Sequence, residues 1–193
     1  MKIGIDINDT VRAYTSQFAT YYKTNIDREF DIDDLDVWSN DLKNIFPFPS
    51  KKDYLEFLYN DYPYEVFGCA KNCHKNLGSR LTDWIKEIEN LDEIPELCIL
   101  STGEYDKTIG STYFYLSKLA CKIGETHLLL KNDDIWDKSD VIITANPDIL
   151  QLKPENKLSV KINTSYNIDV ESDLNYESMM DLLNDDEFIN KLE

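Results

Sequence analysis

Short apolar segments alternate along this chain with longer segments in which apolar residues recur at helical spacing. The short segments predict buried strands at residues 3–6, 97–100, 127–130, 141–143 and 158–162. The longer segments predict helices over residues 11–23, 51–60, 72–88, 108–119 and 176–192, and helical spacing also marks the acidic residues 31–42. Short strands that alternate with helices predict an α/β fold, in which helices cover both faces of a parallel sheet.

The region between the first and second predicted strands is long and mostly helical. It is too long for a single crossover connection. We therefore expect residues 12–76 to form a small helical cap that is inserted after the first strand and lies above the edge of the sheet. Residues 1–11 and 77–193 would then form the core domain. A cap in this position can close over a site and exclude water.

Composition and charge narrow the class of protein. The 193 residues are 42% hydrophobic and 12% aromatic, which is typical of a folded globular domain. The formal net charge of -17 excludes a nucleic-acid-binding surface, because phosphate contacts need clustered Lys and Arg. The acidic runs are either solvated surface or a docking face for a basic protein partner. Without a leader before the first strand or an apolar run long enough to span a membrane, we expect a cytoplasmic protein.

The cysteines do not predict a metal site. In a cytosolic protein the four cysteines are expected to be reduced. Cys69, Cys73 and His74 form a C-x3-C-H pattern, but a zinc site needs a further ligand with defined spacing. Cys121 and His127 are present without any such pattern, so we expect no zinc.

Polar residues follow several predicted strands, at the ends where open parallel sheets place their chemistry. We expect one crevice to be surrounded by Asp6, Asn8, Ser101, Thr102, Lys131, Thr144 and Asn146. A strand-end aspartate, a hydroxyl and a lysine suit phosphoryl transfer: the carboxylate attacks phosphorus, and the other two groups hold phosphate oxygens. Mg²⁺ would neutralise charge in such a site.

Each of these residues also has a purely structural explanation. A carboxylate at the position of Asp6 can accept backbone N–H groups of the following turn. Ser101 and Thr102 can cap the next helix, and Lys131 can be an ordinary solvated lysine.

The order of the motifs resembles the haloacid dehalogenase (HAD) superfamily of phosphatases, and more narrowly its 5'(3')-deoxyribonucleotidase branch. The resemblance rests on Trp84 and on residues 3–11 (IGIDINDTV), 36–38 (DVW), 67–70 (FGCA), 99–101 (ILS) and 140–147 (DVIITANP). It implies a HAD-like, Rossmann-like sheet with a small helical cap. It also implies that Asp6 is the nucleophile and a magnesium ligand, and that Ser101 binds phosphate. The stabilising lysine would be Lys131 or, alternatively, Lys138.

Three residues depart from what the resemblance implies for a working phosphatase. Asn8 stands where the family has its general acid/base aspartate, and Thr144 and Ala145 stand where it usually has a pair of acids. An amide has no proton to give to a leaving alkoxide, and losing acid–base help typically costs about 10²–10⁴ in rate. Threonine and alanine offer little to Mg²⁺, which prefers carboxylate oxygens. Asp148 follows Pro147, and we expect it to point away from the crevice.

These departures favour a protein that keeps the HAD-like fold, has lost phosphatase activity, and serves as a binding or structural module without a cofactor. Its acidity and its aromatic-rich cap suit a protein partner with a basic surface. The aromatic rings of the cap are either such a contact surface or, for most of them, the core of the cap. Its composition resembles that of proteins from AT-rich genomes, and compact nucleotidase-like proteins are frequent in bacteriophages. We therefore expect a phage protein or a virion component.

Two other functions stay open. The first is a Mg²⁺-dependent 5'-deoxyribonucleotidase with an unusual site, in which Asp6 and the backbone carbonyl of Asn8 hold the metal and water or Asp9 replaces the missing acid. The second is a nucleotide sensor that binds phosphate through Ser101, Thr102 and Lys131 without turnover, and that a ligand would stabilise.

Overall fold

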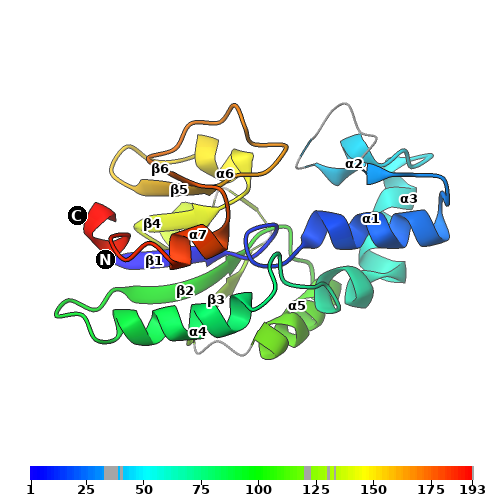
Figure 1. Ribbon diagram of the computed structural model, residues 1–193. Coiled ribbons are helices and arrows are strands. Elements are labelled where there is room, and N and C mark those ends of the chain that lie inside the picture. The colour runs from blue at the N-terminus through cyan, green and yellow to red at the C-terminus, as the bar shows by residue number, and fades with distance from the viewer. Residues whose placement is uncertain (33–38, 40, 120–122, 130, 133, 193) are drawn as a thin grey trace.

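The centre of the molecule is a sheet of six parallel strands (Figure 1). The computed structural model describes residues 1–32, 39, 41–119, 123–129, 131–132 and 134–192. The strand order is β3-β2-β1-β4-β5-β6. The strands are β1 (Lys2–Asp6), β2 (Glu96–Ser101), β3 (Glu125–Leu128), β4 (Val141–Thr144), β5 (Leu158–Ile162) and β6 (Leu174–Tyr176). The predicted α/β fold is confirmed, and β1 lies in the middle of the sheet, between β2 and β4.

Helices cover both faces of the sheet, and each face has its own apolar cluster. One face packs against α4 (Leu77–Ile88), α7 (Met179–Leu183) and the end of α5 (Asp106–Leu119). The other face packs against α6 (Pro147–Gln151) and the 3₁₀ turn η4 (Ile135–Asp137). Ile99 and Leu100 of β2 belong to different clusters, because successive side chains of a strand point to opposite faces.

Gly4 allows β1 to lie close to its neighbours on the second of these faces. A Cβ at this position would come 2.2 Å from Leu100 Cδ1 and 2.4 Å from Ser139 Oγ. A side chain here would therefore collide with both residues, and glycine keeps β1 in register with β2 and β4.

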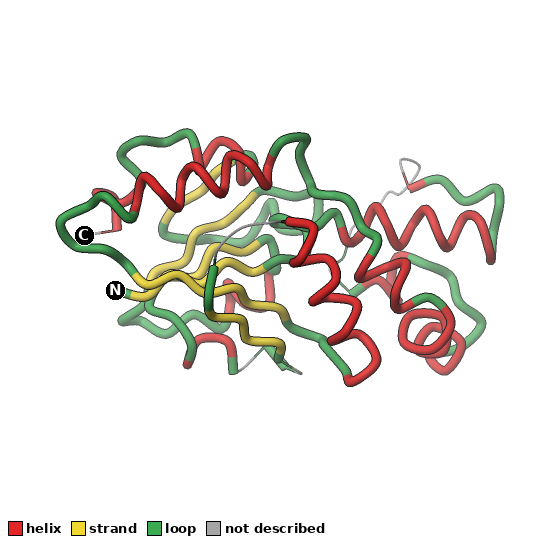
Figure 2. The backbone as a smooth tube through the Cα atoms, turned by 90° about the horizontal axis from the view of Figure 1, so that it is seen from below, coloured by secondary structure: helices red, strands yellow, loops and turns green. Residues whose placement is uncertain are grey.

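A second group of helices lies beyond the carboxyl ends of the strands (Figures 1 and 2). It comprises α1 (Tyr14–Asn25), α2 (Leu42–Ile45), α3 (Lys51–Glu56) and the π-helical turns η2 (Phe57–Asp61) and η3 (Tyr64–Gly68). These elements share an apolar cluster separate from those of the sheet, in which Phe18 contacts Phe46 with ring centroids 4.6 Å apart. We call residues 14–68 the cap helices. The division of the chain at residues 11/12 and 76/77 stays a prediction.

Most aromatic rings of the cap helices form this cluster and not a contact surface. Phe46, Phe57 and Phe67 are buried, and Phe48 and Tyr54 pack against them. Of the two explanations for the aromatic residues of the cap, the packing of these rings favours the core of the cap over a contact surface. Large aromatic side chains hold the cap together because each buries more apolar area than an aliphatic residue would.

The predicted closing helix over residues 176–192 is wrong. The segment instead contains the end of β6, then α7, and later the 3₁₀ turn η5 (Ile189–Leu192). Ser178 caps α7 by accepting from the N–H of Asp181, and the helix ends at Asn184. The Asp185 carboxylate then accepts from Tyr176 and Lys191 and holds the chain in a turn. Apolar spacing alone does not register such side-chain capping.

Other helix boundaries differ more modestly. The helix predicted over residues 11–23 begins at Tyr14, because Val11 and Arg12 lie in a tight turn whose N–H groups both donate to the carbonyl of Ile7. Ser50 is the N-cap of α3, as its sequence position before an apolar pattern suggests. The acidic helix predicted over residues 31–42 falls mostly outside the described residues, as do Trp38 and Cys121. Within the described ranges, no helix has the length and apolar character needed to cross a membrane.

Candidate functional site

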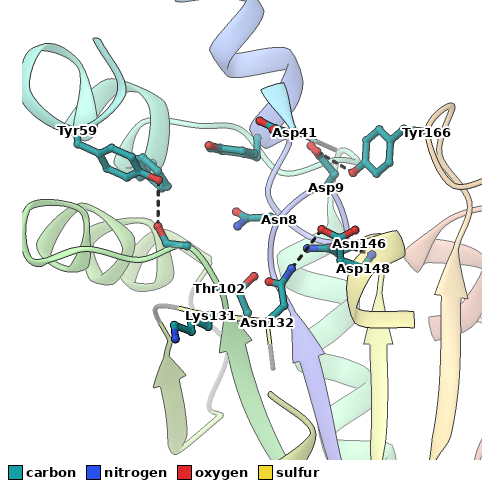
Figure 3. Close-up of a pocket in the computed structure, with 13 residues that line it drawn as sticks. Asn8, Asp9, Asp41, Tyr59, Thr102, Lys131, Asn132, Asn146, Asp148 and Tyr166 are labelled. Atoms are coloured by element: carbon teal, nitrogen blue, oxygen red, sulfur yellow. Dashed lines mark hydrogen bonds between the residues drawn. The ribbon is translucent and has the colours of Figure 1, made fainter. Parts of the chain in front are cut away.

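A crevice of about 490 Å³ separates the carboxyl ends of the strands from the cap helices (Figure 3). Four of the predicted site residues line it, namely Asn8, Thr102, Lys131 and Asn146. Asp9, which the nucleotidase alternative offered as a replacement acid, lines it as well. Its other polar and aromatic lining residues were not predicted as site residues, and they are Tyr14, Asp41, Tyr59, Phe67, Asn132, Asp148 and Tyr166. Asp148 lines the crevice although its position after Pro147 predicted the opposite. The α6 helix that begins at Pro147 is short, and Asp148 lies in its first turn beside the crevice.

Asp6 does not line the crevice but lies buried at the end of β1, with 1% of its surface exposed. Its Oδ2 accepts a hydrogen bond of 2.7 Å from the hydroxyl of Thr144, at the end of the adjacent strand β4. Its Oδ1 has no hydrogen-bond partner among the described residues. Burial raises the pKa of Asp6 to about 7, although the Thr144 hydrogen bond partly opposes this effect.

Asn8 is bound to a buried arginine. Arg12 is fully buried, and its Nε and Nη2 donate to the Asn8 amide oxygen at 3.0 and 2.6 Å. The remaining donors reach the Phe67 carbonyl at 3.0 Å, the Thr112 hydroxyl at 2.9 Å and Glu104 at 3.4 Å. Asn8 stands where a phosphatase of this kind has its catalytic aspartate. Its side-chain oxygen therefore accepts hydrogen bonds from a guanidinium of the same chain.

Ser101, the predicted phosphate-binding hydroxyl, is also committed within the protein. It is fully buried and donates to the Glu104 carboxylate at 2.8 Å. Thr108 and Thr112 donate to the same carboxylate, and Arg12 completes its environment. A protein carboxylate thus receives the hydroxyl and guanidinium donors that a bound anion would otherwise use. We call Arg12, Glu104, Asn8, Ser101, Thr108 and Thr112 the Arg12–Glu104 network.

Asp9 joins the crevice to the cap helices and to the loop after β5. It has a left-handed backbone with φ of 54°, which aspartate tolerates better than most residues. Its carboxylate accepts from the N–H and hydroxyl of Thr15, in the first turn of α1, and from the Tyr166 hydroxyl at 2.9 Å. Burial raises the pKa of Asp9, and these hydrogen bonds oppose the rise.

The remaining predicted residues have different environments. Asn146 accepts from the N–H of Asp148 and is the N-cap of α6. Lys131 is exposed at the crevice, whereas Lys138 does not line it. Of the two alternatives for the motif lysine, Lys131 is therefore the one that a molecule in the crevice would meet.

The residues around Asp6 do not fit a Mg²⁺ ion. Magnesium requires oxygen ligands in near-octahedral geometry, commonly carboxylates. Asp6 Oδ2 already accepts from Thr144, and the predicted second ligand, the backbone carbonyl of Asn8, accepts from the Thr10 hydroxyl at 3.4 Å. Only one carboxylate oxygen, Asp6 Oδ1, is left without a partner among the described residues. Across the part of the chain that the structure describes, no three His, Cys, Asp or Glu side chains are grouped as a metal site.

Sequence comparisons find no match: no protein-family model and no curated protein matches this chain. Structure comparison does find a likeness. A crystal structure from Burkholderia xenovorans LB400, described as a haloacid dehalogenase-like hydrolase, superposes with a TM-score of 0.59 at 12% sequence identity. The match covers 99% of this chain and 97% of the other. The two proteins share the HAD-like fold, and at this identity the likeness extends to the fold alone.

Sequence reasoning also missed four members of the Arg12–Glu104 network, namely Arg12, Glu104, Thr108 and Thr112. A usable signal existed: Arg12 and Glu104 follow neighbouring predicted strands by only a few residues and carry opposite charges. Charges brought together at the same edge of a sheet are expected to pair when the cap excludes water from them.

The raised pKa of Asp6 predicts a specific pH dependence of stability. The folded state binds a proton more tightly than the unfolded state, so the free energy of unfolding falls as pH rises from 3.8 towards 7. The full contribution is about 4 kcal/mol at most. Asp6→Asn removes it, so urea unfolding should show the variant gaining stability relative to the natural protein over this pH range. Asp83→Asn, at an exposed position, is the control. Parallel curves for the natural protein and Asp6→Asn would contradict the assignment.

Breaking the Arg12–Glu104 network should be costly. Glu104→Ala leaves a buried guanidinium and three hydroxyls without their acceptor, and we expect a loss of about 3–5 kcal/mol in urea unfolding. Glu87→Ala is the matched control, since it breaks the more exposed pair with Arg80 and should cost less than about 1 kcal/mol. Equal losses in the two variants would show that the network contributes no more than a surface ion pair.

Proposed function

We propose that this protein is a binding module on a HAD-like fold and does not carry out phosphoryl transfer. The observation that supports this most strongly is the Arg12–Glu104 network. It takes up the side chain of Asn8, which stands where a phosphatase of this kind has its acid/base aspartate, and that of Ser101, the predicted phosphate-binding hydroxyl. Neither side chain can then serve a substrate unless a buried, charge-assisted network first opens.

The environment of Asp6 supports the same proposal. A nucleophilic carboxylate must be ionised and accessible, whereas Asp6 is buried, bonded to Thr144, and has a pKa raised to about 7. The crevice between the sheet and the cap helices remains available to a ligand. The net charge of -17 suits a partner with a basic surface. The proposal includes such a partner, in the cytoplasm or in a virion.

A second candidate, the Mg²⁺-dependent 5'-deoxyribonucleotidase, has one observation in its favour. Asp6 Oδ1 has no partner among the described residues, and Asp148 brings another carboxylate to the crevice. This alternative requires the hydrogen bond between Thr144 and Asp6 to open, so that both oxygens of Asp6 become available.

Phosphate release distinguishes the two candidates. The full chain and the Asp6→Asn variant are incubated with each of the four deoxynucleoside 5'-monophosphates and Mg²⁺, and inorganic phosphate is measured over time. We expect the same background release from both proteins, because no working nucleophile is present to lose. Release by the natural protein that Asp6→Asn abolishes would overturn the proposal and establish the nucleotidase.

A further inference from the structure

The charges that line the crevice are predominantly negative. Asp9, Asp41 and Asp148 contribute carboxylates, whereas Lys131 is the single basic side chain among the described lining residues. Arg12 does not change this balance, because it is fully buried and paired with Glu104. A phosphate dianion entering the crevice would meet three carboxylates and one ammonium group, which disfavours it, whereas a cation would be attracted.

One wall of the crevice is aromatic. Tyr14 and Phe67 have ring centroids 5.3 Å apart, and Phe67 and Tyr59 have ring centroids 6.2 Å apart. Aromatic faces attract ammonium and guanidinium groups through their quadrupoles. Two of these rings already do so within the protein, because the Arg12 guanidinium lies 5.2 Å from the Phe67 ring and 5.9 Å from the Tyr14 ring.

Two of the phenols that line the crevice present acceptors to a ligand. The Tyr59 hydroxyl donates to the Gly103 carbonyl and the Tyr166 hydroxyl donates to Asp9, so both phenol protons are engaged (Figure 3). The carboxylate oxygens and the phenol lone pairs can accept hydrogen bonds from a ligand. A ligand with N–H donors and a positive charge complements these carboxylates and phenols.

We propose that the crevice binds an organic cation, an ammonium or guanidinium group carried on a short flexible chain. Asp41 on the cap side and Asp148 on the sheet side would attract the charge, and the ring wall would pack against the chain (Figure 3). A volume of about 490 Å³ admits a small polyamine, or one lysine or arginine side chain of a basic partner. The inference rests on the proposed function, since it assigns a ligand class to the crevice of a binding module.

The test uses two variants that shift the charge of the crevice in opposite directions. Binding to the full chain is measured by titration calorimetry with spermidine, with Nα-acetyl-lysine methylamide and with deoxythymidine 5'-monophosphate. Asp148→Asn should weaken spermidine binding about three- to tenfold, and Lys131→Gln should strengthen it by a similar factor. Asp83→Asn and Lys86→Gln are the matched controls, because they change net charge equally at an exposed pair on α4 away from the crevice.

Each outcome of these titrations either supports or overturns the proposal of a cation site. Opposite shifts in the crevice variants, with unchanged affinity in the controls, support the proposal. Binding of the lysine derivative as tight as that of spermidine assigns the site to a partner's side chain, and preference for spermidine assigns it to free polyamines. Equal shifts in crevice and control variants, or no binding of either cation, would overturn it. So would nucleotide binding that Lys131→Gln weakens and Asp148→Asn strengthens. Phosphate release is measured in a separate assay. If the crevice does not bind a cation, the conclusion about phosphoryl transfer is therefore unaffected.

Discussion

The guanidinium of Arg12 carries a permanent charge into a place from which water is excluded, and the surrounding site is arranged to satisfy it. Removing such a charge from water costs several kcal/mol, which only close hydrogen bonds and an opposite charge can offset. Asn8, Thr112, the Phe67 carbonyl and Glu104 supply these contacts. Because these groups come from the turn after β1, from η3 and from the region around α5, the network also ties the cap helices to the sheet.

This arrangement occupies the side chains that a phosphatase would use for catalysis. An amide that binds arginine cannot also act as an acid, and a serine that donates to Glu104 does not offer its proton to phosphate. The hydrogen bond between Thr144 and Asp6 has a similar effect at the neighbouring strand end. A fold of this kind carries many different functions. In this protein the side chains at these strand ends make hydrogen bonds within the protein itself.

The sequence predicted the sheet well because buried parallel strands are short apolar runs that end in polar residues, as at Asp6 and Ser101. It predicted the end of the chain poorly, since the three-residue strand β6 and the side-chain bonds of Asp185 leave no periodic pattern. Four of the predicted site residues line the crevice. The Arg12–Glu104 network was missed although each residue follows a predicted strand, because the two residues lie 92 positions apart and only the folded sheet shows that these strands are neighbours.

The central claim is that internal hydrogen bonds hold the places where a metal ion and a phosphate would bind. A crystal structure of the full chain grown with Mn²⁺ and inorganic phosphate at millimolar concentrations tests it directly, since anomalous scattering locates the metal. We predict that Asp6 remains bonded to Thr144 and Ser101 to Glu104, without Mn²⁺ at Asp6. Mn²⁺ coordinated by Asp6, with phosphate bound to the Ser101 hydroxyl, would contradict the account.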